Sequence, residues 1–264
     1  MKRLFVTSIT ATVMGAAALF TTEPVSAADM PVKARPLPPA VWTWTGCYIG
    51  GNVGYARANF RSSDAFVNFP AGPGPRFADF KSDDDGFIGG GQVGCNWQSG
   101  QWVWGIEGDI QWADIKGRRF FQDTFFGIVG AGAFSTEVRS QLDYLGTLRA
   151  RAGFVVAPTT MLYLTGGLAY GRVKNELNFP PPGAATGGPG GTDSQTHVGW
   201  AIGVGGETRL TGNLTGKLEY LYADLGREQY SFLNVAAPNF NYFWKQRVDI
   251  HIVRVGLNYQ FYRN

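Results

Sequence analysis

The sequence predicts an all-β protein, an eight-stranded antiparallel up-and-down transmembrane β-barrel with short periplasmic turns and four long extracellular loops. The first observation is the segment 253–261, where Val, Val, Leu, Tyr and Phe alternate with Arg, Gly, Asn and Gln. A strand with one face in lipid and the other in a polar lumen requires this two-residue period. The second observation is that, beyond the N-terminus, no stretch approaches the roughly 20 apolar residues that a membrane-spanning helix needs. The third is a strict alternation of short and long connections.

Eight segments show the alternation, and the third of them, from Trp102 to Trp112, is the clearest. Its outward set consists of tryptophans, isoleucines and a glycine, whereas Glu107 and Asp109 lie on the other face. Two carboxylates cannot face lipid, so this face must line the lumen. A soluble β-sandwich also alternates, but it would turn polar faces to water on the outside instead of gathering charges inside.

The connections predict the orientation of the barrel. Three are tight turns, around Ser99-Gly100 and residues 157–160 and 210–213. The four others are long, and they cover residues near 58–85, 115–136, 174–195 and 225–246. Outer-membrane barrels have short periplasmic turns and long external loops, so both termini are expected in the periplasm of a Gram-negative bacterium.

The N-terminal segment 1–27 has the features of an export signal peptide. Lys2 and Arg3 provide the positive start, residues 4–20 are mostly apolar, and Val-Ser-Ala at 25–27 provides a small-residue cleavage site. The alternative is a retained anchor helix, which the threonines and serine in the apolar run disfavour.

Three further segments follow. Residues 28–44 are predicted to be a periplasmic linker, because four prolines fall within residues 29–41. Residues 45–261 form the barrel, with no break in composition, and residues 262–264 are a short overhang.

The last strand contains a conflict of phase. Val248, Ile250 and Ile252 alternate in the opposite phase to Val253 and Val255. We therefore expect the register to slip near Ile252–Val253, or the strand to leave the membrane there.

Charged residues on the inner faces predict how the lumen is filled. Five acidic and five basic side chains should pair there, because eight strands leave an interior only wide enough for side chains. The alternative is a narrow ion pathway. The predicted lumen network consists of Glu107, Asp109, Asp143, Arg149, Arg151, Glu207, Arg209, Lys217, Glu219 and Arg254.

The two cysteines, Cys47 and Cys95, are predicted to face each other in the first hairpin. If Arg57 opposes Asp85, Cys47 opposes Cys95, and export to an oxidising compartment permits a disulfide. Two free thiols are the alternative, since directly opposed strand cysteines are geometrically demanding.

Enzyme and metal motifs are weak. Gly89-x-Gly91-x-x-Gly94 matches a dinucleotide fingerprint, but it lies within a strand that ends in a tight turn. The run 83–86, Asp-Asp-Asp-Gly, lacks the rest of a calcium loop. The formal charge of +3 offers no strong basic stripe for nucleic acid. We therefore expect neither catalytic activity nor a resident metal nor a nucleic-acid partner.

Four segments resemble the small outer-membrane immunogenic proteins of alphaproteobacteria, a porin-like family with an OmpA-like barrel. They are residues 44–55, 146–153, 217–226 and 253–261. The resemblance implies surface-exposed antigenic loops and a part in envelope integrity. We expect a monomer that the barrel-assembly machinery inserts and that contacts outer-membrane lipid and lipopolysaccharide. The resemblance also implies hemin binding as an alternative, because some relatives are described as hemin binders.

Two sets of residues are candidates for ligand contacts. His197 and His251, expected near the outer rim, are candidate hemin ligands, but ordinary rim polarity is the favoured explanation. An outer-leaflet lipid enzyme with a rim histidine is a third option, but nothing fixes a serine beside either one. Arg118, Arg119, Arg172 and Lys174 are candidate contacts for lipopolysaccharide phosphates, with a generic solvated surface as the alternative.

Overall fold

The computed structural model describes residues 42–69, 72–76, 80–125, 132–179, 188–233 and 241–261. The signal peptide, the linker up to residue 41 and the overhang 262–264 lie outside the described residues. None of the described residues belongs to a helix that is long and apolar enough to cross a membrane. The strands are β1 (Gly46–Phe69), β2 (Gly72–Arg76), β3 (Phe80–Ser99), β4 (Trp102–Phe125), β5 (Gly132–Ala157), β6 (Thr160–Phe179), β7 (Gly188–Thr211), β8 (Leu214–Leu233) and β9 (Asn241–Phe261).

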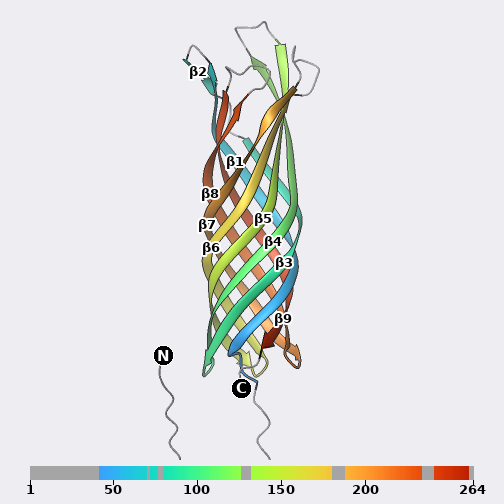
Figure 1. Ribbon diagram of the computed structural model, residues 1–264, viewed down its shortest axis with the longest axis vertical. Coiled ribbons are helices and arrows are strands. Elements are labelled where there is room, and N and C mark those ends of the chain that lie inside the picture. The colour runs from blue at the N-terminus through green and yellow to red at the C-terminus, as the bar shows by residue number, and fades with distance from the viewer. Residues whose placement is uncertain are drawn as a thin grey trace, which may run out of the picture. The chain divides into compact units, whose positions relative to one another are not determined.

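The eight long strands close into an antiparallel barrel (Figure 1). Each pairs with the next in the chain, and β9 pairs back onto β1 from Cys47↔Phe261 to Asn68↔Asn241. The short strand β2 pairs with the far end of β1. The predicted fold class, an eight-stranded up-and-down barrel, is confirmed.

The tight turns lie together at one end of the barrel, where β1 begins and β9 ends (Figure 1). They join Ser99 to Trp102, Ala157 to Thr160 and Thr211 to Leu214. Gly100 and Gly212 have φ values of +61° and +48°, which two-residue hairpin turns require and which glycine adopts without steric cost.

The outer surface of the barrel carries an apolar band. On β4, Trp102, Trp104, Ile106 and Trp112 are all more than half exposed, whereas Val103 between them is 2% exposed. A water-soluble protein would not expose such a surface, whereas lipid covers it in a membrane. The soluble sandwich is therefore wrong.

Beyond this band the strands continue further than the sequence suggested. The range 115–136, expected as a loop, is strand in β4 up to Phe125 and in β5 from Gly132. Most of the other three expected loops are strand as well. The physical reason lies inside the barrel, where buried apolar side chains give these strand extensions a core to pack on.

Of the two alternatives expected for β9, the register slip is wrong. The pairing between β1 and β9 runs without interruption from Cys47↔Phe261 to Ser63↔Lys245. Val248, Ile250 and Ile252 therefore point inward in the same phase as Arg254, and all are buried. The change from apolar inward residues up to Ile252 to the polar inward residue Arg254 reflects different side chains filling the lumen at these two levels. The register of the strand does not change.

Among the register irregularities of the other strand pairs, two affect which side chains face the lumen. Relative to β6, β5 carries an extra residue at Asp143, so that Leu142 and Leu145 both point inward. Relative to β9, β8 carries an extra residue between Asp224 and Arg227, where Gly226 has a φ of +71°. Both are β-bulges, which change the phase of a strand without ending it.

The filled lumen as the candidate functional site

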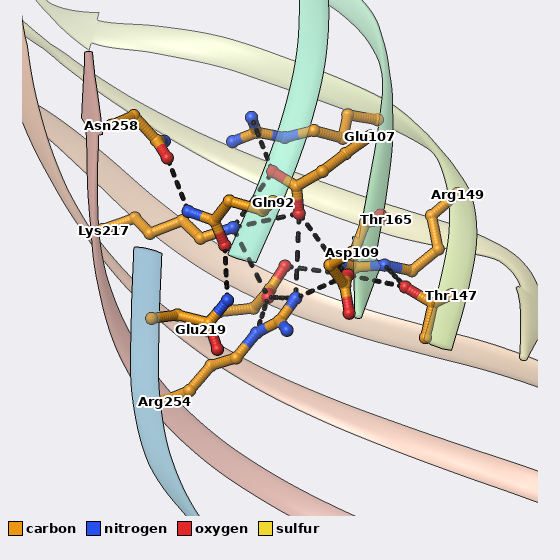
Figure 2. A network of polar contacts seen from close by, with 12 residues as sticks. Gln92, Glu107, Asp109, Thr147, Arg149, Thr165, Lys217, Glu219, Arg254 and Asn258 are labelled. Atoms are coloured by element: carbon orange, nitrogen blue, oxygen red, sulfur yellow. Dashed lines mark hydrogen bonds and ion pairs between the residues drawn. The ribbon is translucent and has the colours of Figure 1, made fainter. Parts of the chain in front are cut away.

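Arg149 of β5 lies at the centre of a buried ionic network in the lumen (Figure 2). Its Nη2 lies 2.6 Å from Glu107 Oε1 and 2.8 Å from Asp109 Oδ2, and its Nη1 lies 2.9 Å from Glu219 Oε1. The Nε atom donates to Thr147 Oγ1 at 2.8 Å. One guanidinium therefore joins three carboxylates from two sides of the barrel.

Two further cations complete this cluster. Arg254 of β9 donates from Nε to Glu219 Oε2 at 2.6 Å and from Nη2 to Asp109 Oδ2 at 3.1 Å. Lys217 of β8 donates to both oxygens of Glu107, at 2.9 and 3.0 Å. Figure 2 shows these side chains converging from opposite strands.

A second part of the network surrounds Arg151. Its Nη2 donates to Glu207 Oε2 at 2.8 Å, and its Nη1 donates to Tyr48 Oη at 2.7 Å. The Tyr48 hydroxyl in turn donates to Glu107 Oε2 at 2.6 Å, which links the two parts. The guanidinium also lies 3.9 Å from the ring centroid of Tyr163, a cation–π contact.

The network contains four carboxylates and four cations, not the five of each sign that the sequence suggested. Asp143 is not in it, because the bulge in β5 turns this residue outward, 4.0 Å from Arg172 Nε. Arg209 is not in it either. Its guanidinium lies at the turn end, 4.6 Å from the Trp42 ring centroid, and its Nε donates to the Gly212 carbonyl. The eight members are at most 6% exposed, so charge balance is a condition for burying them.

Two apolar layers close the lumen on either side of the charges, as the inward side chains of β4 show in order. Val103 is part of a cluster with Trp42, Trp44, Met161 and Tyr163 near the tight turns. Glu107 and Asp109 follow, and then Ala113 and Ile115 belong to a larger apolar cluster towards the other end.

We name these clusters the lower apolar layer and the upper apolar layer. The upper layer consists of Ala56, Ala58, Phe60, Ile88, Ala113, Ile115, Val138, Leu142, Leu145, Ala169, Val173, Leu177, Ala201, Leu221, Ala223, Leu225, Tyr230, Phe232, Trp244, Val248, Ile250 and Ile252. Sequence reasoning missed both layers. The alternation of apolar residues at Val248, Ile250 and Ile252 could have indicated the upper apolar layer. Trp42 and Trp44, beside the proline-rich segment, could have indicated the lower apolar layer.

Cys47 and Cys95 lie directly opposite each other on β1 and β3 and form a disulfide. The bond joins the start of β1 to the end of β3, at the end of the barrel where β1 also pairs with the last residues of β9. It encloses a separation of 48 residues. A cross-link of this kind stabilises a fold mainly by restricting the unfolded chain.

Reduction of this disulfide is expected to lower the free energy of unfolding by about 2–4 kcal/mol. Guanidinium unfolding of the protein in phospholipid vesicles, with and without reductant, measures the difference. The variant Cys47→Ser/Cys95→Ser should match the reduced protein and should no longer respond to reductant. Equal midpoints for the oxidised and reduced proteins would contradict the expectation.

The two histidines lie on opposite faces of the barrel wall. His197 is completely buried in the lumen, and its Nε2 lies 2.7 Å from Tyr230 Oη. His251 lies on the outward face of β9, where its Nδ1 lies 2.8 Å from Tyr220 Oη. Two imidazoles separated by the wall cannot ligate one hemin iron together. Ligation by a single histidine stays a prediction.

Three of the four candidate lipid-contact residues, Arg118, Arg172 and Lys174, lie beyond the apolar band on the outward faces of β4 and β6. Arg118 is exposed, with its Nε 3.4 Å from Glu137 Oε1. Arg172 donates to Ser194 Oγ at 2.9 Å, and Lys174 donates to Glu176 Oε1 at 2.7 Å. The side chain of Arg119 lies outside the described residues.

A closed barrel with an exposed apolar band and a buried ionic interior defines the class of outer-membrane β-barrel proteins. The chain belongs to the outer-membrane protein β-barrel domain family, whose model matches residues 16–261. The expected location in the bacterial outer membrane is confirmed by this match and by the relatives.

The relatives are outer-membrane proteins of alphaproteobacterial genera. The 31 kDa outer-membrane immunogenic protein of Brucella melitensis is 34% identical, over 93% of this chain and 96% of its own length. The 25 kDa outer-membrane immunogenic protein of Brucella abortus is 29% identical, over 89% and 90%. The 22 kDa outer membrane protein of Rhizobium leguminosarum is 28% identical, over 87% and 83%. Among solved structures, OprG of Pseudomonas aeruginosa covers 83% of this chain and 97% of its own, with 15% identity and a TM-score of 0.45.

Proposed function

We propose that this protein is a closed, non-conducting barrel that strengthens the outer membrane and presents its outer strand ends at the cell surface. The observation that carries the proposal is the filling of the lumen, in which the ionic network lies between two apolar layers. An ion would have to displace buried, paired charges and then cross a layer of apolar side chains. Both steps are costly.

The surroundings of the histidines support a role without catalysis. A lipid hydrolase of the kind considered above needs a serine beside its histidine. In the described part of the chain, the side-chain hydrogen bond of each imidazole goes to a tyrosine hydroxyl. The immunogenic relatives support surface presentation, because their names describe outer-membrane antigens.

The proposal predicts that the purified protein shows no stable large conductance in a planar lipid bilayer. A sixteen-stranded porin inserted into the same bilayer is the control, since barrels of that size leave an aqueous channel. Steady openings of porin-like size from the folded wild-type barrel would refute the closed lumen.

A further inference from the structure

The pairing between β7 and β8 ends before the two strands do. Its last pair is Trp200↔Asp224, although β7 begins at Gly188 and β8 continues to Leu233. Beyond this level β7 stays paired with β6, and β8 stays paired with β9. The outer part of the barrel wall therefore contains a seam between β7 and β8.

A groove of about 460 Å³ lies at the foot of this seam, on the outer surface of the barrel. Val198 and Trp200 line it from β7, Asp224 and Arg227 from β8, and Arg247 from β9. We name it the seam groove. Its β7 side is apolar and open to the outside, because Val198 is 62% and Trp200 is 49% exposed. Its other side carries the charged groups.

The bulge in β8 is what brings Arg227 to this groove. Strict alternation from Leu225, which is buried, would have placed Arg227 in the lumen. Asp224 holds the bulge, since its Oδ1 accepts a hydrogen bond from the Gly226 N–H at 2.9 Å. Arg227 is exposed as a result, and it lies directly opposite Arg247 of β9.

The register places further cations beside this pair. Arg247 also opposes Arg61 of β1, and Arg61 opposes Lys81 of β3. The four residues therefore form one row of directly opposed cations across four neighbouring strands. Like charges in such positions repel each other. An anion bound beside the row would relieve that repulsion.

The aspartates next to the row compensate two of its arginines but not Arg227. Asp224 forms an ion pair with Arg247, and Asp249 Oδ1 lies 3.3 Å from Arg61 Nη2. Arg227 forms no ion pair with any residue of the described part of the chain. The two cations and one carboxylate that line the seam groove give it a net charge of +1.

Two other carboxylates near the seam are directed elsewhere. Glu228 follows Arg227 directly, but it opposes Gln246, which is buried in the lumen, so it faces inward. Asp193 of β7 accepts a hydrogen bond from the Ser231 N–H across the seam at 3.1 Å. The positive charge of Arg227 is thus available to a ligand.

The aromatic side chains place the seam groove at the membrane boundary. Trp200 and Tyr222 are neighbours, with ring centroids 5.5 Å apart, and outward aromatics of this kind mark the interface in barrels. Arg227 follows five residues after Tyr222, and the bulge takes up one of the five. At about 3.4 Å per residue and a strand tilt of about 40°, Arg227 lies roughly 10 Å beyond the aromatic pair. Outer-leaflet headgroups occupy this zone.

We propose that the seam groove binds a phosphorylated lipid of the outer leaflet. The phosphate lies between Arg227 and Arg247 and accepts charge-assisted hydrogen bonds from both guanidinium groups. Part of an acyl chain packs on Val198 and Trp200. The apolar wall and the excess positive charge thus match the two ends of one amphipathic molecule. The proposal depends on the outer-membrane location but not on a closed lumen, so the conductance experiment can fail without affecting it.

The test uses the refolded full chain in micelles of a sugar detergent, which carries no phosphate, and measures the binding of a fluorescent diphosphorylated lipid A. We expect Arg227→Gln to bind at least about tenfold more weakly than wild type, which corresponds to about 1.4 kcal/mol for one charge-assisted contact. The matched control Arg118→Gln removes one exposed arginine from β4, on the opposite side of the barrel, and should bind like wild type. Far-UV circular dichroism and the heat-dependent shift of the barrel in electrophoresis show that each variant is folded.

A second variant and two further ligands test the remaining parts of the proposal. Val198→Ser, which leaves every charge in place, should bind diphosphorylated lipid A about threefold more weakly. Lipid A without phosphates should bind to wild type as weakly as diphosphorylated lipid A binds to Arg227→Gln. Inorganic phosphate at the concentration of the lipid should not displace it, because free phosphate lacks the acyl chains. Equal binding of the two lipids, an equal loss in the control, unchanged binding by Val198→Ser, or displacement by inorganic phosphate would each overturn the proposal.

Discussion

Replacing Arg149 by alanine is expected to lower the free energy of unfolding by about 3–5 kcal/mol, the usual cost of breaking a buried ion pair from one side. The guanidinium lies within 2.9 Å of an oxygen of Glu107, Asp109 and Glu219. Its loss leaves four carboxylates facing three cations, all of them at most 6% exposed. The variant must then bury an unpaired charge or protonate a carboxylate, and either is costly.

Guanidinium unfolding in phospholipid vesicles, followed by tryptophan fluorescence, measures this loss. Arg57→Ala is the control, because it removes an arginine whose ion pair with Asp83 is 3.6 Å long and more than half exposed. Exposed pairs of this kind contribute at most about 1 kcal/mol. Similar losses in the two variants would mean that the lumen is wet and that its charges are solvated.

The sequence predicted the core of the network because alternation is a local property. Once Trp104 and Ile106 face lipid, Glu107 and Asp109 must face the lumen, and no knowledge of distant strands is needed. The same argument placed Arg149, Arg151 and Lys217 correctly. Charge balance then required these residues to pair, although the partner of each depends on the stagger between strands.

The errors arose where one strand departs from its neighbour. Asp143 has the right spacing for the lumen, but an extra residue in β5 relative to β6 turns it outward. Such a bulge is a property of two strands together, and a single strand's alternation does not reveal it. The His197 imidazole illustrates another limit. Its burial depends on Tyr230, which belongs to a segment that was expected to be a loop.

The change of phase within β9 has a different physical reason, and it agrees with the second of the two expectations, a strand that leaves the membrane near Ile252. Alternation distinguishes lipid from lumen only while the lumen is polar. Where the interior becomes apolar at Ile252, the outward residues are polar instead, and the pattern inverts although the register does not. An inverted pattern therefore marks the level at which the outside changes from lipid to water.

Leu221→Ala, in the upper apolar layer, is expected to lower the free energy of unfolding by about 3–5 kcal/mol. Leu221 is fully buried and lies two residues beyond Glu219 on β8, where the upper layer meets the ionic network. Removing its side chain loses about 2 kcal/mol of transfer free energy and leaves a cavity between interlocked strands. The closed barrel cannot collapse around that cavity. We therefore expect the full free-energy cost of the cavity in addition to the lost transfer free energy.

Leu218→Ala on the same strand separates the loss of transfer free energy from the cost of the cavity. Leu218 faces outward and is 58% exposed, so lipid or detergent chains can fill the space that its side chain leaves. We expect only the transfer term there, about 2 kcal/mol or less. Unfolding curves of both variants in the same vesicles give the difference directly, and equal losses would show that the upper layer is loosely packed. A larger loss for Leu221→Ala than for Leu218→Ala would support the proposed structural role, because a closely packed interior transmits strain and resists compression.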